Sequence, residues 1–354
     1  MFTHLSGLDA CKPKYLAPIT MKKLLVFVAS LGVFVLAAIP AGAKVPGTNG
    51  QIAFTRHDQA TDEPHTFIAN PDGTDEHELP LPLSGGDPVW SPGGSKLSVN
   101  VFRPEGAPRP ATVNPDGSGF TVLDVPELPR DTDMGCRAWS PDSTRLLCGV
   151  IDFTGHNELD GIYTIRSSDG GGLTRLTTNP YPPAENFGGG DIPGDYSPDG
   201  TKFVFTRAKP GSGSGLDQTG ALFVENTDGT GLHQITPYGL ANSHDEGTAR
   251  WSPDGNVILF AALFGRFSAA SLLVVHSDGT GLRAIHLATP GSVSFPLNPD
   301  WSPDGTRIIF SLFLKSAEHE DIYTARRDGT DVRRVTDTPE FEDRANWGTH
   351  PLTP

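Results

Sequence analysis

The segment Trp251-Ser252-Pro253-Asp254-Gly255 decides the fold, because this pattern returns at intervals of 46 to 57 residues along the chain. An identical copy stands at 301–305, and altered copies stand at 90–94, 139–143, 196–200 and 347–351. A second pattern, built on Asp-Gly, alternates with the first and occurs six times, at 70–74, 114–118, 168–171, 227–230, 277–280 and 327–330. Self-similarity with a period of about 40 to 50 residues is typical of β-propellers. Two independent counts therefore predict six repeat units.

One repeat, taken from residue 248 onward, has the pattern of four short strands joined by tight turns. Pro253 presets φ for the turn, and Gly255 can adopt the positive φ that ends a short hairpin loop. Apolar segments at 257–260 and 272–275 and an alternating segment at 282–285 predict the strands that follow. In three other repeats the fourth segment ends in threonine, at 173–177, 232–236 and 332–336. The sequence thus predicts an all-β, six-bladed β-propeller with four antiparallel strands per blade.

The two ends of the repeat region complement each other. Residues 52–54 have the pattern of a second strand with no aromatic turn before it, whereas Trp347 begins a repeat that has no further strands. We expect the segment around Trp347 to supply the innermost strand of the blade that contains 52–54. Such closure removes free sheet edges. The predicted ring is therefore closed by the N- and C-terminal segments.

The aromatic turn, the following strand, the Asp-Gly turn and a fourth strand ending in Leu-Thr resemble the WD40-like propeller repeats of the TolB family. The resemblance covers residues 50 to 351. It implies a propeller of the cell envelope that binds partner proteins there. TolB proteins also carry a smaller α/β domain before the propeller. Only a few residues separate the leader described next from the first strand, so we expect neither that domain nor a true TolB role in the Tol-Pal system.

Residues 21–43 have the pattern of a secretory signal peptide. Met21-Lys22-Lys23 precede an apolar stretch at 24–39, and Ala41-Gly42-Ala43 has the form of a cleavage site. Sixteen apolar residues are short for the alternative, a transmembrane anchor. We expect residues 1–43 to be an extension and signal peptide cleaved after Ala43, with Met21 the favoured start and Met1 left open. Residues 44–354 are expected to form the propeller, exported to the periplasm, the cell wall or the medium.

Charge and cysteine content limit the partners and the compartment. The net charge of −15 is expected to repel nucleic acid and anionic lipid, and no stable membrane insertion is expected after cleavage. A monomer is expected. Cys136 and Cys148 flank one hairpin turn and are predicted to lie close enough for a disulfide, which export permits. Two buried thiols are the alternative.

The sequence contains no nucleophile elbow, zinc-protease helix, CxxC pair or phosphate-binding loop. The best candidate site is formed by the segments before the innermost strands, which are expected to converge at one mouth of the channel. Its residues are Asp87, Asp131, Asp133, Asp191, Asp195, His244, Asp245, Glu246, Glu342, Asp343 and Arg344. No cofactor is expected, although such carboxylates can also bind Ca²⁺. The structural alternative is solvated loop charge together with hydrogen bonds between blades.

These observations favour a non-enzymatic module that binds a protein, peptide or glycan of the cell envelope at the channel mouth. The alternative is an exported polysaccharide lyase or hydrolase whose site consists of the carboxylates and His244. A scaffold without a ligand of its own is a third possibility.

Overall fold

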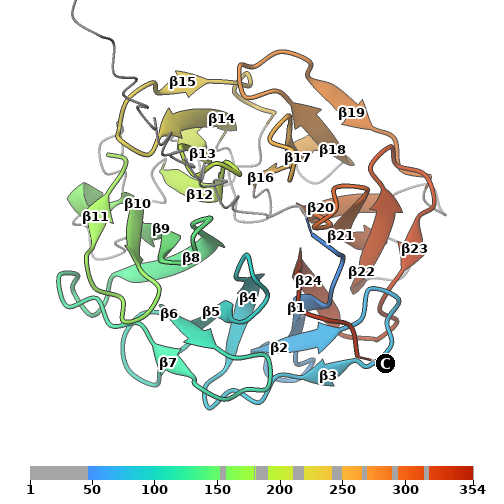
Figure 1. Ribbon diagram of the computed structural model, residues 1–354, viewed down its shortest axis with the longest axis horizontal. Coiled ribbons are helices and arrows are strands. Elements are labelled where there is room, and N and C mark those ends of the chain that lie inside the picture. Colours follow the sequence, from blue (N-terminus) through green and yellow to red (C-terminus); the bar gives the residue numbers. More distant parts are fainter. Residues whose placement is uncertain are drawn as a thin grey trace, which may run out of the picture. The chain divides into compact units, whose positions relative to one another are not determined.

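The computed structural model describes residues 47–151, 157–178, 180, 190–209, 219–240, 249–264, 269–288, 294–314 and 319–353. The repeat region forms six four-stranded antiparallel sheets, which are the blades of a propeller (Figure 1). We number the blades along the chain from the one that contains β1. All-β architecture, six blades and four strands per blade are confirmed.

The first three blades are described from the innermost strand outward. Blade 1 consists of β24 (Phe341–Trp347), β1 (Ile52–His57), β2 (Pro64–Ala69) and β3 (His77–Glu78). Blade 2 consists of β4 (Gly85–Trp90), β5 (Leu97–Val101), β6 (Arg109–Val113) and β7 (Thr121–Val122). Blade 3 consists of β8 (Asp133–Trp139), β9 (Arg145–Ile151), β10 (Gly161–Arg166) and β11 (Thr174–Arg175), with a 3₁₀ turn at Asn157–Leu159.

The second half of the ring repeats this arrangement. Blade 4 consists of β12 (Asp191–Tyr196), β13 (Lys202–Lys209), β14 (Thr219–Asn226) and β15 (His233–Gln234). Blade 5 consists of β16 (Arg250–Trp251), β17 (Ile258–Phe264), β18 (Ala269–Val275) and β19 (Arg283–Ile285). Blade 6 consists of β20 (Ser294–Trp301), β21 (Arg307–Leu314), β22 (His319–Arg326) and β23 (Arg333–Arg334).

The ring closes in blade 1, as the sequence predicts. β24 pairs with β1 in antiparallel register, with Ile52 opposite Trp347. The indole of Trp347 donates a hydrogen bond to the carbonyl of Gly50 at 2.9 Å. Strands from the two ends of the chain therefore share one sheet, and β24, the innermost strand of blade 1, closes the ring.

The core lies between neighbouring blades. Alternate residues of β17 face opposite neighbours: Phe260 packs in a cluster with blade 4 residues, and Leu259 packs in a cluster with Trp301 of blade 6. Both faces of the strand are apolar because each covers a different blade. Trp251 and Trp301 are buried in clusters that join neighbouring blades.

The outermost strands are shorter than their sequence segments suggest. β15 has two residues, whereas the sequence pattern predicts an extended segment over 232–236. Where the ladder ends, Thr236 Oγ1 accepts a hydrogen bond from the N–H of Leu222 at 2.8 Å. Thr177 and Thr336 accept the equivalent N–H groups of Ile162 and Ile322 in blades 3 and 6. In each of these blades the threonine hydroxyl therefore accepts a hydrogen bond that a longer outermost strand would accept through a backbone carbonyl.

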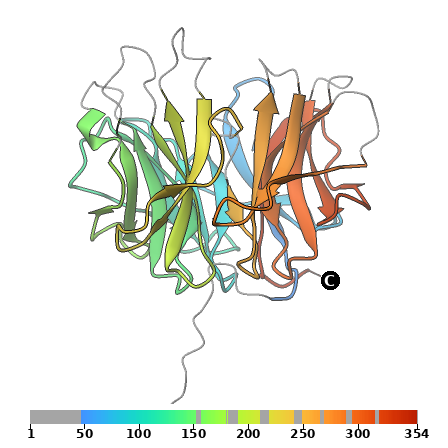
Figure 2. The ribbon, with the colours of Figure 1, turned by 90° about the horizontal axis from the view of Figure 1, so that it is seen from above.

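The strands run between two faces of the propeller, which Figure 2 shows from the side. We call the end where the innermost strands begin the loop face; the described starts include Gly85, Asp133, Asp191 and Phe341. The opposite end is the turn face, and it carries the turns that follow Trp90, Trp139, Tyr196, Trp251 and Trp301.

Candidate functional site

The innermost strands share a local distortion inside the ring. In five of the six, the pairing with the second strand shifts register a few residues before the aromatic position. Such bulges bend the strand and redirect its side chains. Asp87, Asn298 and Arg344 each lie three residues before a tryptophan, and their φ values are 57°, 46° and 55°. Residues other than glycine seldom adopt this conformation, and it is concentrated at functional sites.

Asp87 is the centre of a charged cluster formed at these bulges. Its carboxylate contacts Arg137 Nη1 at 3.0 Å and also Arg344 Nη1, and it accepts a hydrogen bond from Asn100 Nδ2 at 2.9 Å. Burial alone would raise the pKa of Asp87, but the two guanidinium groups outweigh it and hold this pKa well below its usual range. Asp87, Arg137 and Arg344 belong to the innermost strands of three consecutive blades, so the cluster faces the channel.

The cluster continues toward the loop face through Asp343. Arg344 Nε lies 3.2 Å from Asp343 Oδ2, and His57 Nε2 lies 3.6 Å from Asp343 Oδ1. The Asp343 carboxylate raises the pKa of His57 above its usual value, although partial burial opposes the shift. We call Asp87, Arg137, Arg344, Asp343 and His57 the channel charge cluster. It combines both signs of charge and stays partly exposed, with 25% of the Arg344 side chain accessible.

Asp191 and Glu342 are placed differently, because each is paired inside its own blade. Asp191 accepts two hydrogen bonds from Arg207, with Nε–Oδ1 2.6 Å and Nη2–Oδ2 2.7 Å. Glu342 Oε1 accepts from Arg56 Nε at 2.7 Å. The side chains of both carboxylates are fully buried, at 0% exposure. Both pairs join directly opposite residues of the innermost and second strands.

The two arginines also stack on aromatic rings. Arg56 lies over Phe54 and Phe67, and Arg207 lies over Phe205 and Phe223. A repeated tripeptide carries this arrangement, because Phe-Thr-Arg occurs at 54–56 and again at 205–207. The repeated tripeptide could have identified Arg207 and Arg56 as the partners of Asp191 and Glu342, but the sequence analysis did not use it.

The remaining predicted residues do not all join this cluster. Asp133 begins β8 opposite Ile151 and is half-buried at the loop face. His244, Asp245 and Glu246 lie outside the described residues, so their place relative to the cluster stays a prediction.

Two members of the cluster differ from the sequence-based expectation. Arg137 was not predicted, and Asp87 was one of the candidate residues without being singled out as the centre. The sequence signal for Asp87 was its position three residues before the aromatic, which it shares with Arg344.

A second ring of polar residues lies one residue before the aromatic position, closer to the turn face. Asp195, Arg250, Asp300 and Asn346 occupy this position in four blades, and all are buried. Three of them accept the backbone N–H of the aromatic residue in the next blade: Asp195 from Trp251 at 3.1 Å, Asp300 from Trp347 at 3.3 Å and Asn346 from Trp90 at 2.8 Å. They border a cavity of about 30 Å³, which is room for one or two waters. This ring therefore joins the blades.

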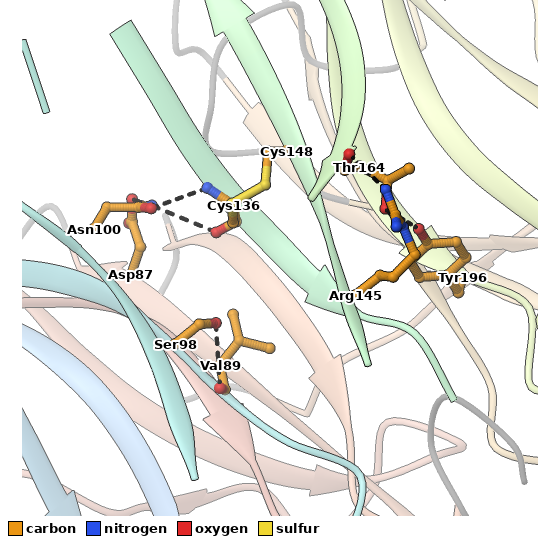
Figure 3. Close-up of a disulfide and its surroundings, with 9 residues drawn as sticks. All are labelled: Asp87, Val89, Ser98, Asn100, Cys136, Arg145, Cys148, Thr164 and Tyr196. Atoms are coloured by element: carbon orange, nitrogen blue, oxygen red, sulfur yellow. Dashed lines mark hydrogen bonds between the residues drawn. A yellow bond between two sulfur atoms is a disulfide. The ribbon is translucent and has the colours of Figure 1, made fainter. Parts of the chain in front are cut away.

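Cys136 and Cys148 form a disulfide between directly opposite residues of β8 and β9. Figure 3 shows Asn100 reaching from blade 2 to the backbone of Cys136, beside Asp87. Asn100 Oδ1 accepts the Cys136 N–H at 2.9 Å, and Asn100 Nδ2 donates to Asp87. The disulfide therefore links β8 to β9 at the residue whose backbone binds Asn100, the hydrogen-bond partner of Asp87.

Membrane spans and metal clusters are both absent from the described part of the chain. None of its helices is long and apolar enough to cross a membrane. No group of three or more His, Cys, Asp or Glu side chains within the described ranges is arranged to hold a metal ion.

Known proteins resemble this chain only at the level of structure. No protein-family model matches the chain, and no curated protein matches it. TolB from Acinetobacter baumannii has a TM-score of 0.59 at 16% identity, covering 84% of this chain and 66% of that one. The putative TolB from Agrobacterium tumefaciens has a TM-score of 0.56 at 18% identity, covering 85% and 99%. A chain of the nidogen/laminin complex has a TM-score of 0.57 at 6% identity, covering 85% and 100%.

These values define the class of protein. The chain is a six-bladed β-propeller that is structurally similar to the propeller of TolB. At identities this low the likeness shows the fold alone, and a propeller fold hosts many functions. The function therefore depends on the residues of the site.

Proposed function

We propose that this protein is an exported, non-enzymatic binding module that recognises a protein, peptide or glycan of the cell envelope at the loop-face mouth of its channel. The observation that carries the proposal is the channel charge cluster, in which Asp87, Arg137 and Arg344 meet from three innermost strands. Binding residues are often held at the ends of a rigid scaffold. Here the left-handed backbone at Asp87 and Arg344 directs both side chains to one place.

The accessible members of the cluster indicate where a ligand makes contact. Arg344, Asp343 and His57 keep 25%, 19% and 29% of their side chains exposed. Asp191 and Glu342 are fully buried, and each already accepts from an arginine. A ligand therefore meets a surface of mixed charge, which suits a polar or zwitterionic group. The similar fold of a chain in the nidogen/laminin complex is consistent with protein recognition by such a scaffold.

Export is supported by the leader pattern at 21–43 and is consistent with the disulfide between Cys136 and Cys148. Disulfides persist in oxidising compartments. Fractionation of the native host, with thiol alkylation before and after reduction, tests this part. The mature protein is expected outside the cytoplasm, starting at Lys44, with both cysteines protected until reduction. Recovery of the uncleaved chain in the cytoplasm contradicts export.

The binding site is tested by substitution of the exposed cluster residues. Arg344→Asn keeps a side chain that tolerates positive φ, and Asp343→Asn removes the neighbouring charge without changing size. The double variant is expected to capture at least tenfold less of its partner from envelope extract, since charged hydrogen bonds contribute about 1.5–3 kcal/mol each. Arg283→Ala, an exposed arginine on the outermost strand β19, is the matched control.

Two outcomes contradict the proposal. Equal capture by the folded double variant and by the wild type places the site elsewhere. Release of sugar fragments or unsaturated products from envelope polysaccharide by the purified protein assigns an enzyme instead of a binding module.

Loss of binding with rising salt is expected, because exposed charges are screened beyond about 8 Å at physiological ionic strength.

A further inference from the structure

Four of the aromatic turns contain a carboxylate that closes the turn with hydrogen bonds. In blade 3, Asp142 Oδ1 accepts from Ser140 Oγ at 2.6 Å, from the Thr144 N–H at 3.0 Å and from Thr144 Oγ1 at 2.8 Å. Asp199, Asp254 and Asp304 accept the equivalent serine hydroxyl and backbone N–H in blades 4, 5 and 6. Burial opposes ionisation of these side chains, but the hydrogen bonds outweigh it and lower the pKa of all four. The donors of this turn thus form a site for a carboxylate.

The turn of blade 2 has the same backbone but lacks the carboxylate. The Ser91 N–H donates to the Lys96 carbonyl at 2.8 Å, just as the Ser140 N–H donates to the Arg145 carbonyl at 2.8 Å. The Lys96 N–H donates to Ser91 Oγ at 3.0 Å, as the equivalent residue does in the other turns. Gly93 stands where the other turns have aspartate. Ser91 and Ser95 therefore keep their donors in place, and none of the described residues accepts a hydrogen bond from the Ser95 N–H or hydroxyl.

These donors border a cavity of about 270 Å³ between blades 2 and 3. Seven serine and threonine residues line it, among them Ser91, Ser95 and Thr112, together with Lys96 and Trp139. The cavity is close to the lower end of the range for small-molecule sites, about 300 to 1,000 Å³. Gly93 is exposed beside the cavity and does not line it, and a Cβ added there meets no atom within 4 Å, so a carboxylate has room next to the turn. Lys96 also lines the cavity, and its Nζ donates to Asn114 Oδ1 at 3.2 Å, which leaves two of its three donors for a ligand.

We propose that this cavity binds a small ligand through a carboxylate, which takes the place that aspartate occupies in the other turns. The ligand accepts hydrogen bonds from the Ser91 hydroxyl, the Ser95 N–H and the Ser95 hydroxyl, and pairs with Lys96. Charge-assisted bonds of this kind are stronger than neutral ones. The walls combine serine and threonine hydroxyls with the apolar ring of Trp139, so they suit a remainder with both polar and apolar parts. The site lies on the turn face and is independent of the loop-face mouth.

Titration with acetate tests the site directly, with the backbone amide of Ser95 followed by ¹⁵N NMR on the mature protein. We expect a saturable shift with acetate and none with acetamide, which has the same shape but no charge. Titrations with D-glucuronate and N-acetylglycine then distinguish a sugar acid from the carboxyl end of a peptide as the ligand. The compound of the correct class is expected to bind at least tenfold more tightly than acetate. No saturable shift with acetate, or equal shifts with acetamide, overturns the proposal.

Substitution at Gly93 provides a matched pair of variants. Gly93→Asp supplies the carboxylate from the chain itself, so it is expected to abolish the acetate response and to raise Tm by about 1 to 3 °C through the added hydrogen bonds. Gly93→Ala fills the same open space without a carboxylate and is expected to bind acetate within twofold of the wild type. Binding of acetate by folded Gly93→Asp at wild-type strength refutes the assignment.

Discussion

At the scale of single residues, His57 connects the surface of the loop face to the channel charge cluster. The Asp343 carboxylate raises the pKa of this histidine, because the protonated ring is favoured beside a negative charge. Its folded-state pKa is therefore above its unfolded value, near 6.5. The resulting contribution to stability is fully present below about pH 6.5 and is lost as the pH rises through the folded-state pKa.

Titration of His57 by NMR is expected to give a pKa above 6.5, and Asp343→Asn is expected to lower it. The stability difference between pH 5.5 and pH 8 is also expected to be smaller in His57→Gln than in the wild type. Comparison with spectra of His57→Gln identifies the resonance. A wild-type pKa at or below 6.5 contradicts the contact with Asp343.

Trp301 is a residue whose burial alone predicts a large energetic effect. Only 1% of it is exposed, and its Nε1 donates to the Arg250 carbonyl at 3.3 Å across the boundary between blades 5 and 6. Trp301→Ala is expected to lower the free energy of unfolding by about 3 to 5 kcal/mol. Denaturant unfolding measures this. Leu282→Ala, at an exposed position, is the control, expected to stay within about 0.5 kcal/mol. A loss below about 1 kcal/mol at Trp301 contradicts its packing role.

At the scale of elements, buried ion pairs hold the innermost strand of two blades to the second strand. In blade 1, Arg56 of β1 contacts Glu342 of β24 and also the more exposed carboxylate of Glu76 at 2.7 Å. Burial raises the pKa of Glu342, and Arg56 opposes that shift. Removal of one partner leaves an uncompensated charge, which is more costly than replacement of both.

Arg56→Met alone is therefore expected to lower the free energy of unfolding by about 3 to 5 kcal/mol at neutral pH. The double variant Arg56→Met/Glu342→Leu is expected to recover most of that loss. Chemical denaturation of the two single variants and the double variant forms a complete thermodynamic cycle. Strictly additive losses contradict a coupled pair.

At the scale of the whole molecule, closure depends on β24, which is distant from β1 in sequence. Strands β24 and β1 also carry both members of the Arg56–Glu342 pair, and the bulge of β24 contributes Arg344 to the candidate site. Ring closure and the candidate site are therefore coupled. Loss of β24 removes the innermost strand of blade 1 and, with it, Asp343 and Arg344 of the channel charge cluster.

Truncation before Phe341 is expected to unfold the propeller or to lower its Tm by more than about 10 °C, because it removes the innermost strand of blade 1 and the buried Trp347. Truncation after Pro351 retains β24 and removes the Thr353 contacts to Asn70 and Gln51, so a small change is expected. Thermal unfolding by circular dichroism distinguishes the two. Equal Tm values for the long truncation and the full chain contradict closure through β24.

The propeller, the blade count and the closure could be predicted without coordinates, because they follow from turn chemistry and apolar periodicity, which are local. The aromatic turn ends the innermost strand, Asp-Gly ends the third, and the unpaired segments at 52–54 and Trp347 fit one blade. A disulfide between Cys136 and Cys148 was one of two open alternatives, and the register of β8 and β9 places the two cysteines directly opposite each other.

The composition of the site depends on contacts between distant parts of the chain. Asp87, Arg137 and Arg344 are far apart in sequence, and they meet because three bulged strands face one channel. From the sequence Glu342 and Arg344 belonged to one candidate segment, whereas in the structure Glu342 is paired with an arginine on the next strand and Arg344 stays accessible. Whether a charge is exposed depends on which side chain lies opposite it in the sheet, and that is set by register and ring closure rather than by the local sequence.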